Sequence, residues 1–85
     1  MQRTKTDTKT LIVNILAEDA ELGNSGVFDK WAIQSGLEDI FGYRLLNTSA
    51  AWTDFQDSLN ELIAEGTVVK YLTASAWDYT LATNL

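Results

Sequence analysis

The sequence predicts an α+β domain that is mainly α-helical and ends in a small β-hairpin. Three segments carry apolar residues at helical spacing, and two β-branched and aromatic runs follow them near the C-terminus. The 85 residues have room for one modest core, because chains of this size bury only about 60 to 70% of their surface on folding. We therefore expect a flexible basic tail over residues 1–7 and a single domain over residues 8–85.

The first helix is expected to begin near Thr8 and to end at Gly23. Asp7 or Thr8 can cap its N-terminus, and glycine readily adopts the left-handed conformation that ends a helix. The residues before Thr8 are polar and show no apolar periodicity, so they are expected to fray. The apolar stripe of this helix has the spacing i, i+1, i+4, i+5 and i+9 and consists of Leu11, Ile12, Ile15, Leu16 and Ala20.

A second helix is expected from about Asp29 to Gly42. The turn cluster GNSG at residues 23–26 precedes it, and residues 27–28 can form a short strand before the helix starts. Gly36 interrupts the helix at a cost of about 1 kcal/mol relative to Ala, so a kink or a split is expected there. The apolar stripe is expected to face the core with the connection that follows it packed alongside. The stripe consists of Trp31, Ala32, Ile33, Leu37, Ile40 and Phe41, and the connection contributes Tyr43, Leu45 and Leu46.

The third helix has the clearest periodicity and leads into the hairpin. Thr53 with Gln56 fits a capping box at its N-terminus, although Ser49 could start the helix one turn earlier, and Gly66 ends it. The runs TVVKYLT and WDYTLAT follow, separated by residues 74–76, and both are rich in strand-forming residues. In the second run, one face of the strand carries Trp77, Tyr79 and Leu81. The apolar stripe of the helix spans a sector of about 100° and consists of Trp52, Phe55, Leu59, Leu62 and Ile63.

Composition excludes several classes of function. The chain has no Cys and no His, so it lacks disulfides, thiolate metal sites and the usual groups for nucleophilic or acid–base catalysis. No glycine-rich phosphate loop is present, and three carboxylates on one helix are too few ligands for a metal ion. No apolar run reaches the roughly 20 residues that a membrane span needs. We expect a cytoplasmic protein that is not an enzyme and has no cofactor, metal or small-molecule ligand.

The order helix, short strand, helix, helix and hairpin, together with the stretches FQDSLNELIAEGTVVKY and WDYTLA, resembles the winged helix-turn-helix superfamily. The resemblance implies a three-helix domain whose third helix enters the major groove of DNA and whose hairpin, the wing, supplies a basic residue to the backbone. The superfamily also includes protein-interaction modules, so the fold does not imply one function. The residues that carry the resemblance most specifically are Phe55, Leu59, Leu62, Gly66 and Val68.

The charge of the chain departs from the pattern of DNA-binding members. Residues 1–10 hold three bases and one acid, a net charge of +2, which leaves three bases and eleven acids, a net charge of −8, in the remaining residues. Such a surface repels phosphates, so nucleic acid is the less expected partner. The wing tip TASA carries no charge, and the outward face of the third helix is expected to consist of Thr53, Asp54, Asp57, Glu61 and Ala64.

The leading hypothesis is a small acidic module that binds a protein partner or a second copy of itself as a homodimer. Asp54, Asp57 and Glu61 lie at i, i+3 and i+7 on one helix face, which is either a solvated surface or a contact for a basic partner. If Trp77 is exposed, it is expected to form an apolar patch with Tyr79 or Tyr71 that suits a dimer or partner surface.

Two alternatives remain for the function. A DNA-binding transcriptional regulator would use the basic tail and the wing, through Arg3, Lys5, Lys9 and Lys70. An acidic mimic of nucleic acid, comparable to small phage-encoded inhibitors, would instead occupy the nucleic-acid site of another protein. If the N-terminal residues neutralise the carboxylates of the third helix, the preference for a protein partner over DNA no longer holds.

Overall fold

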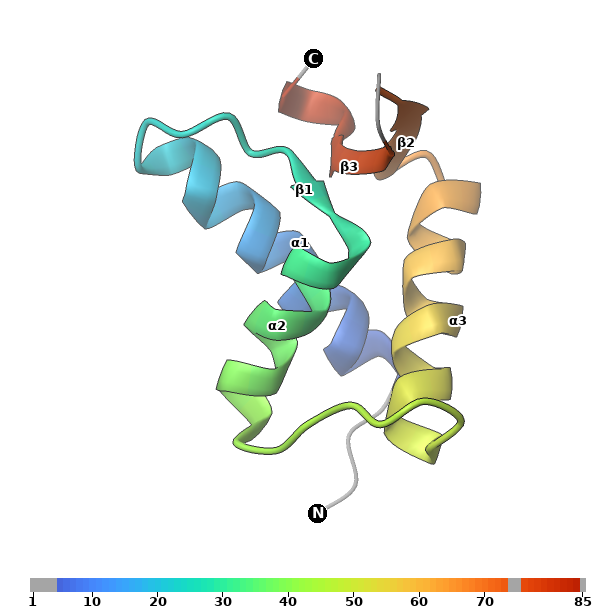
Figure 1. Ribbon diagram of the computed structural model, residues 1–85. Helices are drawn as coiled ribbons and strands as arrows, with labels where there is room; N and C mark the ends of the chain where they lie inside the picture. The colour runs from blue at the N-terminus through green and yellow to red at the C-terminus, as the bar shows by residue number, and fades with distance from the viewer. Residues whose placement is uncertain (1–4, 74–75, 85) are drawn as a thin grey trace.

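The computed structural model describes residues 5–73 and 76–84 and places three helices against a small antiparallel sheet (Figure 1). The fold is therefore α+β and mainly helical, as predicted. Within these residues, no helix combines the length and the apolar character that crossing a membrane requires. The elements are α1 (Lys5–Glu21), β1 (Phe28–Asp29), α2 (Lys30–Phe41), α3 (Ala50–Ala64), β2 (Val68–Leu72), β3 (Trp77–Leu81) and a short 3₁₀ helix, η1 (Ala82–Asn84).

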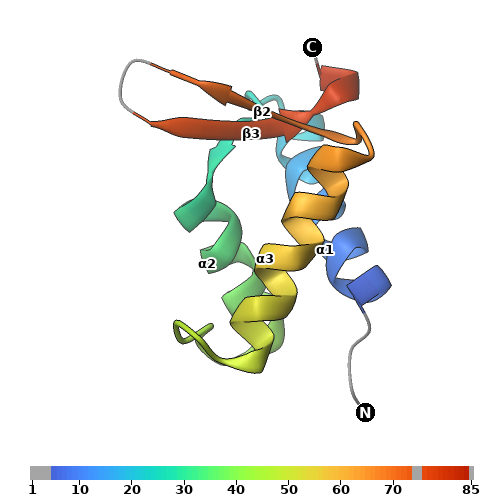
Figure 2. The ribbon, with the colours of Figure 1, turned by 90° about the vertical axis from the view of Figure 1, so that its right-hand side faces the viewer.

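The sheet has the strand order β1–β3–β2, and both strand pairs are antiparallel. β2 and β3 form the predicted hairpin, with Val68 opposite Leu81 and Leu72 opposite Trp77. β1, which begins one residue later than predicted, pairs with the other edge of β3. Figure 2 shows the hairpin running across one end of the three helices. This order of helices and strands is compatible with a winged-helix-like arrangement, and residues 74–75 of the predicted wing tip lie outside the described residues.

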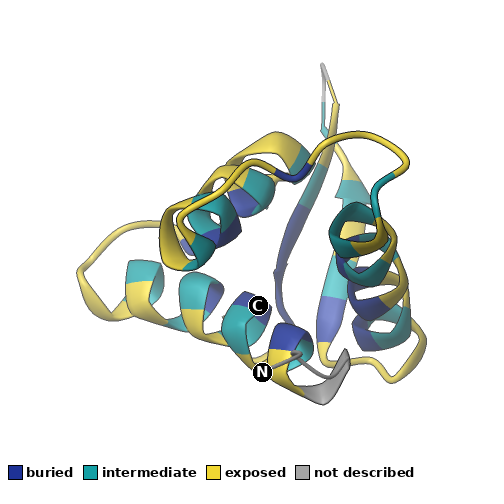
Figure 3. Cartoon of the chain, turned by 90° about the horizontal axis from the view of Figure 1, so that it is seen from below, coloured by how far each residue is buried: buried dark blue, intermediate teal, exposed yellow. Residues whose placement is uncertain are grey.

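A single core joins the helices to the sheet. The buried positions lie on the sides of the helices that face one another and on the strands that cover them (Figure 3). Burying a large apolar side chain typically contributes about 1.5 to 3 kcal/mol, so this cluster supplies most of the stability of so small a domain. The buried apolar residues are Ile12, Leu16, Ile33, Leu37, Leu45, Phe55, Leu59, Leu62, Val68, Tyr79 and Leu81.

α1 begins before its apolar stripe does. The predicted caps Asp7 and Thr8 are wrong, because the helix starts at Lys5 and contains both residues. Thr8 is fully buried, and its hydroxyl donates a hydrogen bond to Asp54 of α3. Residues 5–7 of the predicted tail are therefore helical, and residues 1–4 lie outside the described residues. Gly23 follows the helix with a φ of +87°, as predicted.

α2 is one continuous helix, so the split predicted at Gly36 is wrong. A Cβ at Gly36 would lie 3.0 Å from Ile15 Cδ1 of α1, and the glycine therefore lets the two helices approach closely. Asp29 is the N-cap, since its carboxylate accepts a hydrogen bond from the Ala32 N–H at 2.7 Å. Gly42 ends the helix in the left-handed conformation, with a φ of +78°.

α3 starts at the earlier of the two predicted caps. The Ser49 hydroxyl accepts a hydrogen bond from the Trp52 N–H at 3.1 Å, and Gly66 follows the last turn with a φ of +82°. In the connection before α3, only one of the three apolar residues that were predicted to pack against the core is buried. That residue is Leu45, whereas Tyr43 and Leu46 are exposed.

Candidate functional site

The acidic residues of α3 lie largely on the side that meets α1. Lys9 of α1 places its Nζ 2.6 Å from Glu65 Oε1 and 3.7 Å from Glu61 Oε1. The hydrogen bond to Glu65 raises the pKa of Lys9, so this lysine stays charged. Farther toward the N-terminus of α3, Asp54 accepts the hydrogen bond from the Thr8 hydroxyl. α1 thus engages two of the three predicted acidic contacts, Asp54 and Glu61.

Asp57 is the third predicted acidic contact, and it is exposed on the outer side of α3 together with Thr53 and Ala64. These three residues lie opposite the apolar stripe, as predicted. Asp54 and Glu61 belong instead to the flank that packs beside α1 and are only partly exposed. The outward side of α3 is therefore less acidic than the sequence predicts.

The four bases predicted as nucleic-acid contacts do not form one group. Lys9 is paired with carboxylates of α3, Lys5 is the first residue of α1, and Arg3 lies outside the described residues. Lys70 lies on β2, and its Nζ is 4.7 Å from the ring centroid of Trp77 on β3. Lys70 is therefore not paired with the carboxylates of α3 but belongs to a second group of residues.

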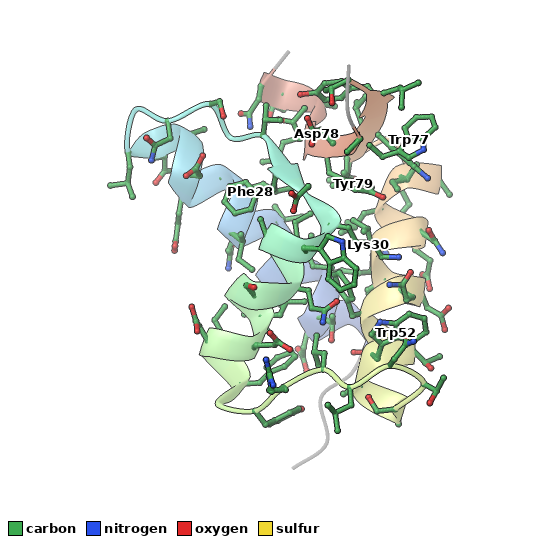
Figure 4. The ribbon with its side chains drawn as sticks, viewed as in Figure 1. Phe28, Lys30, Trp52, Trp77, Asp78 and Tyr79 are labelled. Carbon is green, nitrogen blue, oxygen red and sulfur yellow. The ribbon has the colours of Figure 1, made fainter. Side chains whose placement is uncertain are left out.

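That second group contains all three tryptophans of the chain and the three bases that follow residue 10. Lys30 Nζ lies 6.0 Å from the ring centroid of Trp52, a distance at which a cation is attracted to the ring. Burial lowers the pKa of Lys30, and the charge of Lys70 lowers it further. Figure 4 shows Lys30 between Trp77 and Trp52. We name this surface, between α2, α3 and the hairpin, the front face, and define it by Lys30, Trp31, Arg44, Trp52, Lys70 and Trp77.

The register of the hairpin brings Lys70 and Trp77 to the same side of the sheet. Lys70 lies opposite Tyr79 and Leu72 lies opposite Trp77, and residues directly opposite in an antiparallel pair point to the same side. Tyr79 packs in the core, and burial raises its pKa, so the predicted exposed patch of Trp77 with Tyr79 is wrong. Trp77 lies nearer the hairpin tip and is 49% exposed.

Trp31 is exposed, contrary to the prediction that it belongs to the core. Its side chain is 73% exposed, whereas Ile33 and Leu37 of the same helix are fully buried. At 100° per residue, Trp31 points about 140° away from the mean direction of these two residues. The helical direction of Trp31 relative to Ile33 and Leu37 therefore argues against its burial, although its apolar character suggests the core.

A cavity of about 390 Å³ opens on the front face between α2 and α3. A second hollow of about 330 Å³ adjoins it, shares four of its lining residues and adds Ser35, Glu38, Arg44 and Leu46. The first hollow is in the size range of about 300 to 1,000 Å³ that is typical of ligand sites. We name it the α2–α3 cavity, and its lining consists of Lys30, Trp31, Gln34, Leu45, Asn47, Trp52 and Gln56.

The polar groups of this cavity differ in how far they are satisfied. Gln34 Nε2 donates a hydrogen bond to the Leu45 carbonyl at 3.3 Å, and the Leu45 N–H donates to Glu38 Oε2 at 2.7 Å. Gln56 Nε2, in contrast, is buried and has no hydrogen-bond partner in the part of the chain that the structure describes. A buried donor without an acceptor is costly, and because Gln56 lines the cavity, a rotation of its side chain would present this amide to an acceptor there.

No protein-family model matches the chain, and no curated protein or solved structure matches it. The geometry itself is therefore the basis for assigning a function.

Sequence reasoning had singled out two of the six front-face residues as contacts, Lys70 and Trp77. It missed Lys30 and Arg44, since two separate bases in an acidic chain form no visible cluster until the helices bring them together. Among residues 5–73 and 76–84, no group of three or more Asp and Glu residues is arranged to hold a metal ion. The front face offers cations, indole rings and amides, which are groups that bind a ligand without covalent chemistry.

Proposed function

We propose that this protein is a winged-helix-like module that binds nucleic acid through its front face. The observation that carries the proposal is the separation of charge within an acidic molecule. Lys9 pairs with the acidic flank of α3, whereas Lys30, Arg44 and Lys70 form no ion pair within the described residues. Three unpaired cations on one surface are suited to contact successive phosphates.

The other groups of the front face fit the same ligand. Indole rings stack on bases of any sequence, and lysines beside them contact the adjoining phosphates. The amides that line the α2–α3 cavity can hydrogen-bond to the edges of bases, as Asn and Gln do when they bind adenine. These amides belong to Gln34, Asn47 and Gln56.

The position of the face within the fold also supports the proposal. Its residues come from the N-terminal part of α2, the connection between α2 and α3, the N-terminal half of α3 and the hairpin. In winged helix-turn-helix proteins that bind DNA, the third helix and the wing approach the nucleic acid together. The resemblance and the clustering of bases both involve α3 and the hairpin, although the front face uses the flank of α3 that turns toward α2 and the family pattern uses its outward side.

The test is binding of fluorescently labelled mixed-sequence DNA, single-stranded and duplex, at low ionic strength. The variant Lys30→Gln with Lys70→Gln removes two cations of the front face and is expected to weaken binding about tenfold. The control, Asn14→Asp with Leu22→Glu, changes the net charge by the same amount at exposed positions of α1 and just beyond it. It is expected to weaken binding much less, because these positions are away from the front face.

Two results would reject the proposal. One is the absence of binding to either form of DNA at low salt. The other is an equal loss of affinity in the front-face variant and in the charge control, which would show that only net charge matters. Circular dichroism and thermal unfolding of both variants establish that they are folded.

Protein binding is the second candidate function, and exposed apolar side chains on and beside the front face favour it. Trp31, Leu46, Leu72 and Trp77 are all exposed, and tryptophan is enriched among the residues that dominate protein interfaces. A homodimer through this surface predicts a molar mass that doubles as concentration rises, measured by light scattering. It also predicts that Leu46→Lys with Leu72→Lys keeps the protein monomeric.

A further inference from the structure

We infer that the α2–α3 cavity receives a single unstacked nucleobase, so the protein prefers single-stranded or locally opened nucleic acid to an intact duplex. This inference rests on the proposed function and specifies its ligand. It depends on the walls of the cavity, on the unsatisfied amide of a residue that lines it and on the position of the lysines beside it.

The walls of the cavity are suited to a flat aromatic ring. Trp31 contributes an indole from α2, and Trp52 contributes one from α3. Trp52 packs partly against the core, which fixes its ring, whereas most of Trp31 is in contact with water. An exposed indole beside a cavity gains contacts when a base stacks on it, and stacking tolerates every base because each has a π face.

The amide of Gln56 supplies a specific requirement for a polar ligand. Its Nε2 is buried without an acceptor among residues 5–73 and 76–84, although the side chain lines the cavity. A nucleobase carries ring nitrogens and carbonyl oxygens on its edges, and either group accepts this hydrogen bond. A purely apolar occupant would leave the donor unsatisfied, so the cavity favours a heteroaromatic ring over an aliphatic side chain.

The lysines attract a negatively charged group of the ligand to a position next to that ring. Lys30 lines the same cavity and lies over Trp52, and Lys70 is close enough to affect its pKa. Trp77 beside Lys70 offers a further stacking surface on the hairpin. A base in the cavity with its phosphate at the two lysines, and the neighbouring base on Trp77, satisfies all of these groups at once.

A paired base within a duplex cannot enter the cavity unless it leaves the stack, which costs free energy. A single strand does not have to pay this cost. An acidic peptide would also be attracted to the lysines, but it brings no aromatic ring with hydrogen-bond acceptors on its edge. The observations therefore favour a single-stranded nucleic acid over a peptide.

The test compares four probes by fluorescence anisotropy and by quenching of the intrinsic tryptophans. The probes are a single-stranded DNA of about 12 nucleotides, the same strand with abasic residues at its centre, the corresponding duplex, and a poly-glutamate peptide of similar charge. The full chain is used throughout. We expect the ordinary strand to bind at least about tenfold more tightly than each of the other three.

Two variants then locate the base. Trp31→Ala alters an exposed side chain, and Gln56→Leu keeps the size of the side chain while removing the amide, so both are expected to fold. Each is expected to lower the affinity for the ordinary strand, Trp31→Ala by about tenfold, and to bring the ratio of ordinary to abasic affinity toward one. Asn60→Ala, an exposed substitution on the outer side of α3, is the matched control and is expected to keep that ratio.

The outcomes separate this inference from the proposed function. If ordinary and abasic strands bind equally while the lysine variant still loses affinity, the cavity does not hold a base, and nucleic-acid binding stands. If poly-glutamate binds as tightly as the ordinary strand, both are overturned in favour of an acidic protein ligand. If a free mononucleotide displaces the labelled strand at the same concentration at which the unlabelled strand does, the ligand is a nucleotide and not a strand.

Discussion

Thr48 is the residue other than glycine that has a positive φ, +67°, within the described chain. A β-branched side chain in this region crowds the backbone, at a cost of about 1 to 2 kcal/mol. Thr48 follows Asn47, which lines the α2–α3 cavity, and precedes Ser49, which caps α3. The strain therefore lies in the connection that shapes the rim of the candidate site.

Replacing Thr48 by glycine is expected to raise the free energy of unfolding by about 0.5 to 1 kcal/mol. The relief of strain exceeds the extra chain entropy that glycine gives to the unfolded state. Gly42 also has a positive φ, +78°, and an added Cβ would meet open space there. Gly42→Ala is therefore expected to lower the free energy of unfolding by about 1 kcal/mol through backbone strain alone. Urea denaturation measures both changes. A Thr48→Gly protein less stable than the parent would show that the threonine is not strained.

Trp31 and Tyr79 show why single residues are hard to place from the sequence. Both are aromatic residues within apolar patterns, yet Trp31 is mostly exposed and Tyr79 is buried. The direction of a side chain follows from the helical or strand period, but its burial depends on whether another element covers that direction. β1 pairs with β3 at Tyr79, where it lies opposite Phe28, and that contact joins residues far apart in the chain.

The ends of the helices were more predictable because their signals are local. Asp29, Gly42, Ser49 and Gly66 all lie at the helix ends that the sequence indicated. The start of α1 was not predicted, since it depends on a distant contact. Thr8 is buried and donates a hydrogen bond to Asp54 of α3. The spacing of apolar residues does not predict the burial of a polar residue of this kind.

Ser49→Ala is expected to lower the free energy of unfolding by about 1 kcal/mol, the usual cost of losing an N-cap. The substitution removes the acceptor for the Trp52 N–H and loosens the first turn of α3. It should therefore weaken binding of single-stranded DNA as well, since Trp52 forms a wall of the α2–α3 cavity. Thr53→Ala, an exposed change in the same turn, is the control and is expected to alter stability by less than about 0.5 kcal/mol. Equal effects of the two changes in thermal unfolding would contradict the capping role.

The two flanks of α3 explain most of the difference between the predicted and the observed site. A helical wheel shows which residues lie opposite the apolar stripe, but it does not show which flank meets which neighbour. Asp54 and Glu61 turn toward α1, whereas Trp52 and Gln56 turn toward α2. Packing of the helices therefore places part of the predicted acidic face on the flank beside α1, while the flank that turns toward α2 forms a wall of the cavity.

The whole molecule combines a net charge of −6 with a local concentration of positive charge. The excess of negative charge destabilises the compact state through self-repulsion. The same excess repels phosphates from the acidic parts of the surface. The proposed nucleic-acid-binding module is therefore expected to bind in one orientation.

Salt is therefore expected to change stability and binding in opposite directions. Added salt screens the repulsion among carboxylates, so the melting temperature rises with NaCl concentration. It also competes with the cations of the front face, and three phosphate contacts predict a slope of about −2 in a plot of log K against log salt for a single strand. Lys30→Gln with Lys70→Gln reduces the contacts to one, so the slope becomes about −0.7, while the melting temperature still rises with salt. Thermal unfolding and anisotropy titrations over the same salt series measure both quantities. A slope that stays near −2 in the double variant would place the phosphates away from the front face.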